Sequence, residues 1–368
     1  MISGIKKYNM IHIFVDFLKY NIPYWNTMVN FNVMEEECMR IEEGAKIVVE
    51  DWLHAKKGDL IYFITDETKR REAKAFKEAT EKVGAICEIT ELDSTQIQSG
   101  ACIDELRWEM AKADAIVGAT NYSFITTDAV HYALSRGVQF LSMPMSTNDG
   151  SSLLEQEFLR MDPDEASRIG MPMFWQLRNA SHIHVTTELG TDLHFNITDR
   201  FPGIFHGSLW EPGKCSSASF EIYIPPVEIK THGKLVLDGS MGYIGLVEKP
   251  LKITFENGYI KCIEDTPDGV KLLRYIKSFN DLEMFCAAEF GIGLNTVAKC
   301  QGISYIEDES AYGTFHIGFG RNLALGGSHN AAGHFDLVTH NPTIVVDDKV
   351  IMKNGVAKGI RIDNHGMI

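Results

Sequence analysis

The feature that most constrains the fold is an alternation of strand and helix in the first half of the chain. Leu60–Thr65 is a short run of β-branched and aromatic residues, which is typical of a buried parallel strand. Asp66 stands where a helix N-cap belongs, and Glu67–Val83 carries apolar residues at helical spacing. Gly84 ends that helix, and Ala85–Glu91 returns as a strand. This order predicts a βαβ unit.

A second unit of the same kind follows. Its expected elements are a helix, a strand, a helix and a strand, over Cys102–Ala113, Ala115–Thr120, Thr126–Ser135 and Gln139–Met143. The repetition predicts a parallel sheet that is covered by helices on both faces. Two further helices are expected upstream, at Met34–Leu53 and, as an amphipathic helix packed on the protein or in a subunit interface, at Met10–Trp25.

The pattern changes after about residue 178. One helix is expected at Val270–Ser278, and glycine turns separate short strands at His182–Thr187, Asp192–Ile197, Ser219–Ile224, Gly233–Asp238, Leu251–Glu256 and Tyr259–Ile263. This spacing predicts an α+β domain rich in antiparallel or mixed strands. We therefore expect an α/β Rossmann-like domain at residues 1–178 and a metal-binding catalytic domain at residues 179–368, joined between Gly150 and Asn179.

The turn after the first strand argues against a nucleotide cofactor. A dinucleotide-binding fold needs a glycine-rich turn there, whereas this chain has Thr65-Asp66-Glu67-Thr68, with carboxylates where a pyrophosphate would lie. We expect no NAD or ATP. Three serines near strand ends, Ser123, Ser142 and Ser146, lack a nucleophile-elbow pattern and are interpreted as capping or turn residues.

Composition limits the partners. The 368 residues carry a net charge of −15, which argues against nucleic acid, because a phosphate partner selects a basic face. The seven cysteines form no Cys-x-x-Cys pair, as expected of reduced thiols in the cytoplasm. Met10–Trp25 contains Asp16, Lys19 and Asn21, so it is neither a signal peptide nor a membrane span. We expect a cytoplasmic protein without nucleic-acid or membrane partners.

The last third of the chain holds the candidate chemistry. In His334-Phe335-Asp336 the imidazole and the carboxylate are two apart, so on a strand they point the same way and can bind one ion. His316 and Glu289 lie nearby in the sequence within glycine-rich segments, and glycine lets the backbone approach a ligand closely. Mixed nitrogen and oxygen ligands suit Zn²⁺, Mn²⁺ or Fe²⁺. The pattern predicts a catalytic metal site.

These motifs, in this order, resemble the M29 metallopeptidases (aminopeptidase T and aminopeptidase S type) and their relatives, the 2,5-dihydroxypyridine dioxygenases. The segments that carry the resemblance are Gly190–Leu193 with Arg200, Glu289–Asn295, Gly313–Gly318 and Gly333–Asp336. In the peptidases two glutamates, two histidines and an aspartate hold two metal ions. The resemblance places these ligands at Glu221, Glu289, His316, His334 and Asp336. The segment before Glu221 departs from the peptidase pattern, and Arg321 to Leu323 lack the expected tyrosine.

The resemblance implies a metallohydrolase, an aminopeptidase-like metalloprotease that acts on small peptides or amides. Two ions of zinc, manganese or cobalt would activate a water, with Glu289 or Glu221 as the proton acceptor, and a homodimer would enclose the site. The alternative is a non-haem iron dioxygenase that opens a hydroxylated pyridine ring, with Fe(II) held by His316, His334 and Asp336. A metal-free small-molecule binding protein is the third class considered.

Overall fold

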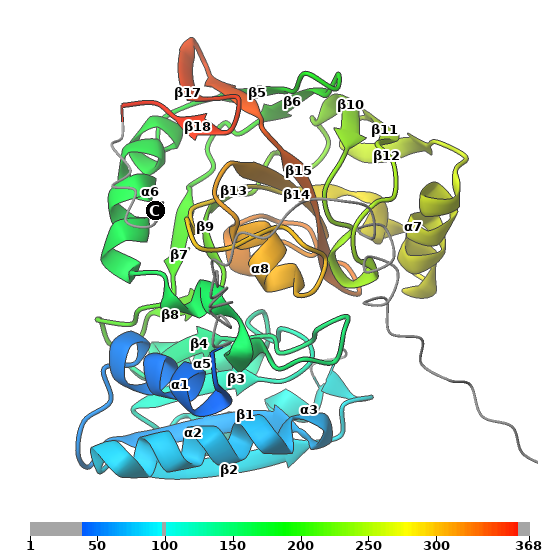
Figure 1. Ribbon diagram of the computed structural model, residues 1–368. Coiled ribbons are helices and arrows are strands. Elements are labelled where there is room, and N and C mark those ends of the chain that lie inside the picture. The colour runs from blue at the N-terminus through cyan, green and yellow to red at the C-terminus, as the bar shows by residue number, and fades with distance from the viewer. Residues whose placement is uncertain (1–38, 98–100, 360–368) are drawn as a thin grey trace, which may run out of the picture. The chain divides into compact units, whose positions relative to one another are not determined.

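The computed structural model describes residues 39–97 and 101–359, all of which fall in one compact unit. The helix expected at Met10–Trp25 lies outside these residues. Figure 1 shows a layered arrangement, with a helix-covered parallel sheet at one end and two antiparallel sheets beyond it. This confirms a mixed α/β fold with a parallel sheet followed by antiparallel strands. The division into domains at residue 178 stays a prediction.

The parallel sheet, called sheet A, has the strand order β2-β1-β3-β4-β8. Its strands are β1 (Leu60–Asp66), β2 (Ile86–Leu92), β3 (Ala115–Ala119), β4 (Gln139–Ser142) and β8 (Cys215–Ser217). The four strands that the sequence predicts are confirmed within one or two residues. The sequence does not predict β8, which arrives from beyond residue 178 and pairs in parallel with β4.

Helices cover both faces of sheet A because alternate side chains of each strand point to opposite sides. Ile61 and Phe63 face the core under the first helices, and Tyr62 and Ile64 face a second cluster under the others. The covering elements are α1 (Ile41–Lys46), a π-helical turn η1 (Ile47–Trp52), a 3₁₀ turn η2 (Glu67–Lys69), α2 (Arg70–Val83), α3 (Ala101–Asp104), α4 (Arg107–Met110) and α5 (Asp128–Ser135).

Two of the expected helices differ from the prediction. The helix predicted up to Leu53 changes from α to π geometry at Ile47, and the extra residue of that turn accompanies the full burial of Trp52, which packs edge-to-face on Phe220. The helix predicted over Cys102–Ala113 is divided into α3 and α4, and Asp104 at the break accepts the backbone N–H of Ala129 in α5. The Asp66 cap is confirmed, because its carboxylate accepts the N–H of Thr68.

An eight-stranded antiparallel sheet, sheet B, has the order β12-β11-β10-β6-β5-β16-β17-β18. Its strands are β5 (His182–Thr186), β6 (Asp192–Asn196), β10 (His232–Leu237), β11 (Leu251–Glu256), β12 (Tyr259–Ile263), β16 (Thr343–Val346), β17 (Lys349–Lys353) and β18 (Val356–Ala357). The inner residues of β5 and β6 are fully buried, and the outer ones are partly exposed.

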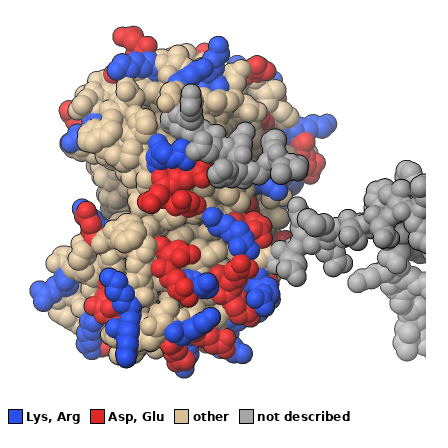
Figure 2. All heavy atoms as spheres, turned by 60° about the vertical axis from the view of Figure 1, so that its left-hand side comes forward, with Lys and Arg blue, Asp and Glu red and all other residues tan. Residues whose placement is uncertain are grey.

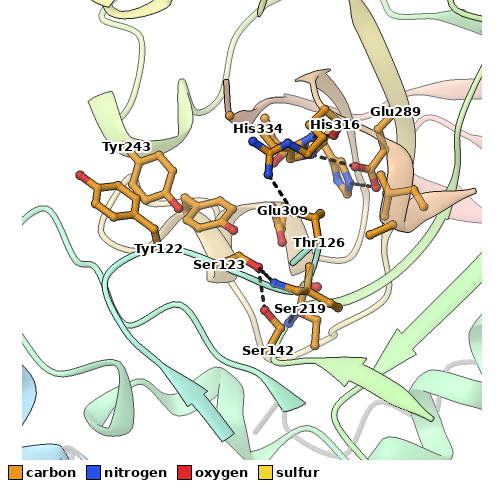
Figure 3. A pocket seen from close by; sticks show the side chains of 18 of the residues that line it. Tyr122, Ser123, Thr126, Ser142, Ser219, Tyr243, Glu289, Glu309, His316 and His334 are labelled. Atoms are coloured by element: carbon orange, nitrogen blue, oxygen red, sulfur yellow. Dashed lines mark hydrogen bonds and ion pairs between the residues drawn. The ribbon is translucent and has the colours of Figure 1, made fainter. Parts of the chain in front are cut away.

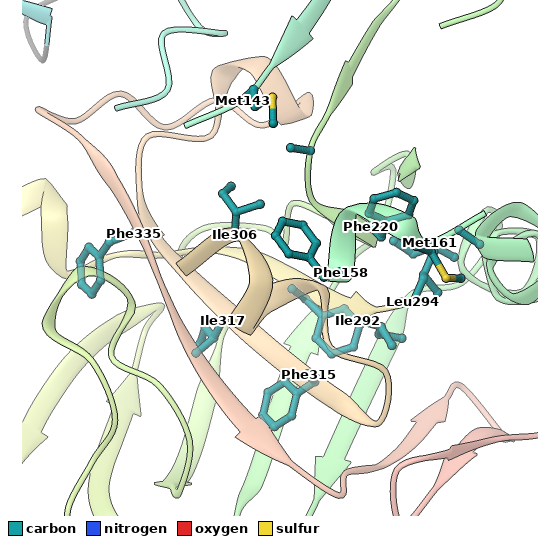
Figure 4. Packing of buried hydrophobic residues seen from close by; sticks show 14 of the residues in the cluster. Met143, Phe158, Met161, Phe220, Ile292, Leu294, Ile306, Phe315, Ile317 and Phe335 are labelled. Carbon is teal, nitrogen blue, oxygen red and sulfur yellow. The ribbon is translucent and has the colours of Figure 1, made fainter. Parts of the chain in front are cut away.

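A five-stranded antiparallel sheet, sheet C, has the order β15-β14-β13-β9-β7. Its strands are β7 (Gly203–His206), β9 (Phe220–Ile224), β13 (Ala287–Gly293), β14 (Thr314–Gly320) and β15 (His334–His340). Apolar side chains on one of its faces pack in the main core, among them Ile292, Phe315, Ile317 and Phe335 (Figure 4). The other longer helices are α6 (Pro163–Leu177), α7 (Pro267–Ser278) and α8 (Tyr305–Ser310), and 3₁₀ turns lie at Leu153–Glu155, Glu157–Arg160, Gly242–Ile244, Leu282–Phe285 and Leu323–Leu325.

Charged side chains contribute less to holding the fold than this core does. On the face shown in Figure 2, acidic and basic side chains are interspersed, most densely over the α/β end of the described residues. Pairs such as Arg70–Glu91 and Arg160–Glu43 are largely exposed, and exposed pairs contribute about 0–1 kcal/mol each. No helix among the described residues has the length and apolar character that a membrane crossing requires.

Helix α8 is unusual because three successive carboxyl side chains, Glu307, Asp308 and Glu309, are buried in it. Burial raises the pKa of Glu307 to about 7 and the pKa of Asp308 to about 6. A raised carboxyl pKa means that the folded chain binds the proton more tightly than the unfolded chain does. The contribution to stability is therefore fully present below the unfolded pKa and is lost as the pH rises through the folded pKa.

We predict that Glu307→Gln stabilises the protein above pH 7 and has little effect below pH 4.5. The amide oxygen can still accept the Lys299 backbone N–H that Glu307 accepts, while the cost of a buried charge disappears. The expected gain at pH 8 is on the order of 2–3 kcal/mol, measured as the free energy of unfolding in urea. The exposed Glu88→Gln is the control. An equal gain at both pH values would contradict the assignment.

Candidate active site

The five residues predicted as metal ligands lie on one face of sheet C. Cross-strand pairing sets this face, because Glu289 and Asp336 both pair with Gly318, and His334 pairs with Gly320. On the same face His316 pairs with Gly291, and Glu221 pairs with Gly293. Directly paired residues point to the same side of a sheet, so the structure brings together all five predicted side chains.

Glycine is required between the ligands because their side chains occupy the space above it. A Cβ atom at Gly291 would lie 1.8 Å from Nε2 of His316. A Cβ atom at Gly318 would lie 2.7 Å from the Cβ atom of Glu289 and 2.8 Å from a carboxylate oxygen of Asp336. Gly291 and Gly318 therefore make room for ionisable side chains, a more specific role than backbone flexibility.

The five side chains form two overlapping groups that share Glu289. In the first, Nε2 of His316 lies 2.7 Å from Oε2 of Glu221 and 3.9 Å from Oε1 of Glu289. In the second, Nε2 of His334 lies 3.0 Å from Oε2 of Glu289 and 3.4 Å from Oδ1 of Asp336. The ligand atoms of each group lie within 4.8 Å of one another, which suits a bound metal ion.

The electrostatics of the cluster depend on opposite charges held close together away from water. Burial by itself lowers the pKa of His316, but the carboxylates of Glu221 and Glu289 outweigh it and raise that pKa to about 10. For His334 the effect of burial is likewise outweighed by Asp336 and Glu289, which raise its pKa. Burial raises the pKa of Glu289, but the neighbouring imidazoles of His316 and His334 outweigh it and lower that pKa to about 2.

The cluster fits a metal ion better than it fits protons alone. Oδ1 of Asp336 and Oε2 of Glu221 are buried without a hydrogen-bond partner among the described residues, although each lies near an imidazole. Nδ1 of His334 lies 2.9 Å from the backbone oxygen of Arg321, so it donates there and leaves Nε2, on the side of the carboxylates, able to bind an ion in place of its proton. That orientation is how metal-binding histidines are usually held. Imidazole and carboxylate together accept several divalent ions.

A pocket with a cavity of about 130 Å³ opens over this face of sheet C (Figure 3). All five cluster residues line it, together with the segment that follows β3, from Tyr122 to Thr126. The site therefore combines the carboxyl end of a parallel strand with one face of sheet C. Ligands in α/β sheets commonly bind at that end of the strands.

Several pocket residues are not predicted from the sequence. Four tyrosines line the pocket from loops and helices, namely Tyr122, Tyr243, Tyr275 and Tyr305, together with Phe279, Glu309 and Arg321. Ser123 and Ser142, interpreted above as capping or turn residues, also line it, with hydroxyl oxygens 2.9 Å apart. No motif marks these positions, because they come from separate elements that only the tertiary fold brings together.

Glu309 adds a buried carboxyl group beside the cluster. Burial, together with the negative charges of Asp336, Glu221 and Glu289, raises its pKa well above the usual range. A protonated carboxyl group there can donate a hydrogen bond to Asp336. Arg321 lies on another wall, where its Nη1 donates to Thr126 Oγ1 at 3.0 Å and its Nε donates to the Ala331 oxygen at 2.9 Å.

Solved structures with the same fold carry two different activities in their names. The 2,5-dihydroxypyridine dioxygenase from Pseudomonas putida KT2440 aligns with 87% of this chain and 98% of its own, at a TM-score of 0.74 and 19% identity. The aminopeptidase T from Thermus thermophilus aligns with 86% of this chain and 98% of its own, at a TM-score of 0.56 and 15% identity. At these identities the likeness shows a shared fold.

The sequence comparisons separate the two activities. In a curated relative, the 2,5-dihydroxypyridine 5,6-dioxygenase of Pseudomonas putida, 26% of 192 aligned residues are identical, which covers 49% of this chain and 55% of the relative's length. The expectation of an aminopeptidase-like hydrolase is therefore wrong. That expectation depended on the five candidate metal ligands. Imidazole and carboxylate ligands serve hydrolytic and oxidative metals alike, so the ligands do not distinguish the two activities.

A family profile covers a larger part of the chain. The profile of the 2,5-dihydroxypyridine 5,6-dioxygenases (NicX) matches residues 53–359. This range includes all of sheets A, B and C and every residue of the metal cluster. The chain belongs to the 2,5-dihydroxypyridine 5,6-dioxygenase family.

Proposed function

We propose that this protein is a non-haem iron dioxygenase that opens a hydroxylated pyridine ring. The observation that carries the proposal is the imidazole–carboxylate cluster on the wall of a ring-sized pocket, in a chain of this family. A cavity of about 150 Å³ is known to hold a benzene-sized molecule, so the 130 Å³ found here suits one aromatic ring better than a peptide.

Glu289, His334 and Asp336 would hold the ferrous ion, with His316 on the far side of Glu289. Their ligand atoms form one compact group, whereas His316 groups with Glu221 and Glu289. We therefore place Glu289 among the iron ligands beside His334 and Asp336, at the position for which His316 is expected in the sequence analysis. When bound, iron supplies the one-electron chemistry that allows O₂ to react with a closed-shell aromatic ring.

The pocket walls would orient the planar substrate. Tyr243 packs on Tyr305 with ring centroids 4.5 Å apart, and Tyr122 packs on Tyr243 at 5.6 Å, so a continuous aromatic surface faces the cluster. A flat ring can stack on such a surface. Arg321 has no carboxylate in ion-pair contact among the described residues and donates only to Thr126 and Ala331, so its charge can attract an ionised ring hydroxyl.

A homodimer and a cytoplasmic location belong to the same proposal. The dimer is supported by the resemblance to the aminopeptidase group, and the location by the dispersed free cysteines. A small aromatic molecule is the partner that the pocket fits.

The proposal predicts that protein reconstituted with Fe(II) without air binds one iron per chain and consumes O₂ when 2,5-dihydroxypyridine is added. An oxygen electrode and the loss of the substrate's ultraviolet absorbance measure the reaction. Asp336→Asn should abolish both iron binding and oxygen uptake, because an anionic ligand is lost, while the exposed Asp348→Asn should keep both. Full iron binding without oxygen uptake on any hydroxylated pyridine would contradict the proposal.

Two glutamate variants test which carboxylates hold the ion. Glu289→Gln should lower iron content, because Glu289 belongs to both ligand groups. Glu221→Gln should leave one iron per chain and reduce turnover by roughly 10–100-fold, the usual effect of losing a group that surrounds the metal ligands. Iron content by elemental analysis separates the two. Equal loss of iron in both variants would place Glu221 among the ligands and contradict this assignment.

A third prediction concerns the glycine beneath His316. Gly291→Ala should displace the imidazole, because the added carbon would lie 1.8 Å from its Nε2 atom, and should lower turnover while one iron per chain is kept, since His316 lies outside the proposed ligand set. Ile292→Val is the matched control, since the neighbouring side chain points to the core on the opposite face. A cost of about 0.5–1.5 kcal/mol in stability with normal activity is expected for that control. Normal turnover in Gly291→Ala would show that His316 has no role.

A further inference from the structure

A second cluster of potential metal ligands lies on the outer face of sheet B. It is formed by His184 on β5 and by Asp192 and His194 on β6, whose ligand atoms lie within 4.8 Å of one another. None of these residues lines the pocket, and they belong to a different sheet from the iron ligands proposed above. The cluster is therefore separate from the proposed dioxygenase site, and its argument does not depend on that function.

Strand pairing builds this cluster. His194 pairs directly with His184 on one side and with His232 of β10 on the other, so three imidazoles form a row across three neighbouring strands. Asp192 and His182 lie two residues from this row on their own strands and point to the same side. The residues between them, such as Ile183 and Leu193, are buried in the core beneath.

The rings are held parallel and close together. His184 and His194 stack with centroids 4.2 Å apart and an interplanar angle of 6°, and His194 and His232 stack at 5.0 Å and 11°. Nδ1 of His194 lies 3.1 Å from Nε2 of His182, and that contact fixes the ring of His194 with Nε2 towards Asp192. Metal-binding histidines are commonly held by such a partner on the other ring nitrogen.

The spacing of the ligand atoms suits one ion. Oδ1 of Asp192 lies 2.8 Å from Nε2 of His184 and 3.5 Å from Nε2 of His194. Atoms bound to zinc at about 2.0–2.1 Å in a tetrahedron lie roughly 3.3–3.4 Å apart, so small side-chain rotations would complete the arrangement. Side-chain exposures of 34%, 62% and 30% for His184, Asp192 and His194 leave the remaining positions open to water.

We propose that His184, Asp192 and His194 form a surface binding site for a divalent transition-metal ion, zinc above all. Two imidazoles and a carboxylate are a ligand set of catalytic and exchangeable zinc sites, and copper and nickel would bind to the same atoms. The ion would join β5 to β6 through side chains. Lys234 would weaken binding of the ion, because this residue pairs with Asp192 across the strands and places a positive charge beside the site.

The test is zinc binding to the full-length protein after chelator treatment, by isothermal titration and by elemental analysis after dialysis. His184→Gln and His194→Gln should each lose one zinc ion per chain, whereas His131→Gln, an exposed histidine on α5, should not. Glu289→Gln changes metal binding only at the pocket, so its effect should add to that of His194→Gln. Far-UV circular dichroism confirms that the variants are folded.

A variant that is expected to bind zinc more tightly keeps the test independent of any loss of folding. Lys234→Gln should tighten zinc binding, because a neighbouring positive charge is removed while all three ligands remain. Unchanged zinc binding in His184→Gln or His194→Gln would show that protons alone hold the cluster together, and would overturn the proposal. Unchanged zinc affinity in Lys234→Gln would show that the ion does not lie beside Asp192. That result would also overturn the proposal.

Discussion

The pairing of sheet C, with ionisable side chains and glycines alternating over one face, is the constraint on which the rest of the site depends. Glu289, His316 and Asp336 can lie together only because Gly291 and Gly318 leave the space that they occupy. The opposite face of the same strands carries Ile292, Phe315 and Phe335 in the core. A slip of one residue in any strand would exchange these two faces, so core packing and ligand geometry are fixed by the same register.

Burying these groups is costly unless an ion or opposite charges compensate for the lost hydration. The cluster contains more carboxylates than imidazoles, and Glu309 adds a further carboxyl group at its edge. The concentration of negative charge raises the pKa of His316, His334 and Glu309 alike, so each of these groups holds a proton more tightly than it would in water. A divalent cation would compensate for the same charge more directly, which explains why buried carboxylate oxygens lack hydrogen-bond partners here.

The sequence predicts the parts of this protein that local patterns control. Strand periodicity predicts β1 to β4 and most of sheet B, and the ligand residues are found because His-x-Asp on a strand and glycine-rich segments are local signals. It does not predict β8, because a three-residue strand that joins a distant sheet has no local pattern. The pocket walls are missed for the same reason, since Tyr122, Tyr243 and Tyr305 are far apart in the chain.

The activity was the least predictable property, and the reason is chemical. The ligands determine which metal ions can bind. They do not determine the reaction, because hydrolysis and oxygenation both use imidazole and carboxylate ligands. On the function proposed above, the reactions would be distinguished by the space beside the metal cluster, where the rings of Tyr122, Tyr243 and Tyr305 and the charge of Arg321 would suit a ring with an ionised hydroxyl better than an extended peptide. The aromatic surface is assembled from α7, α8, the 3₁₀ turn at Gly242–Ile244 and the loop after β3, none of which carries a proposed metal ligand. Specificity in this fold therefore lies in the covering elements, while sheet C supplies a metal cluster that different reactions can use.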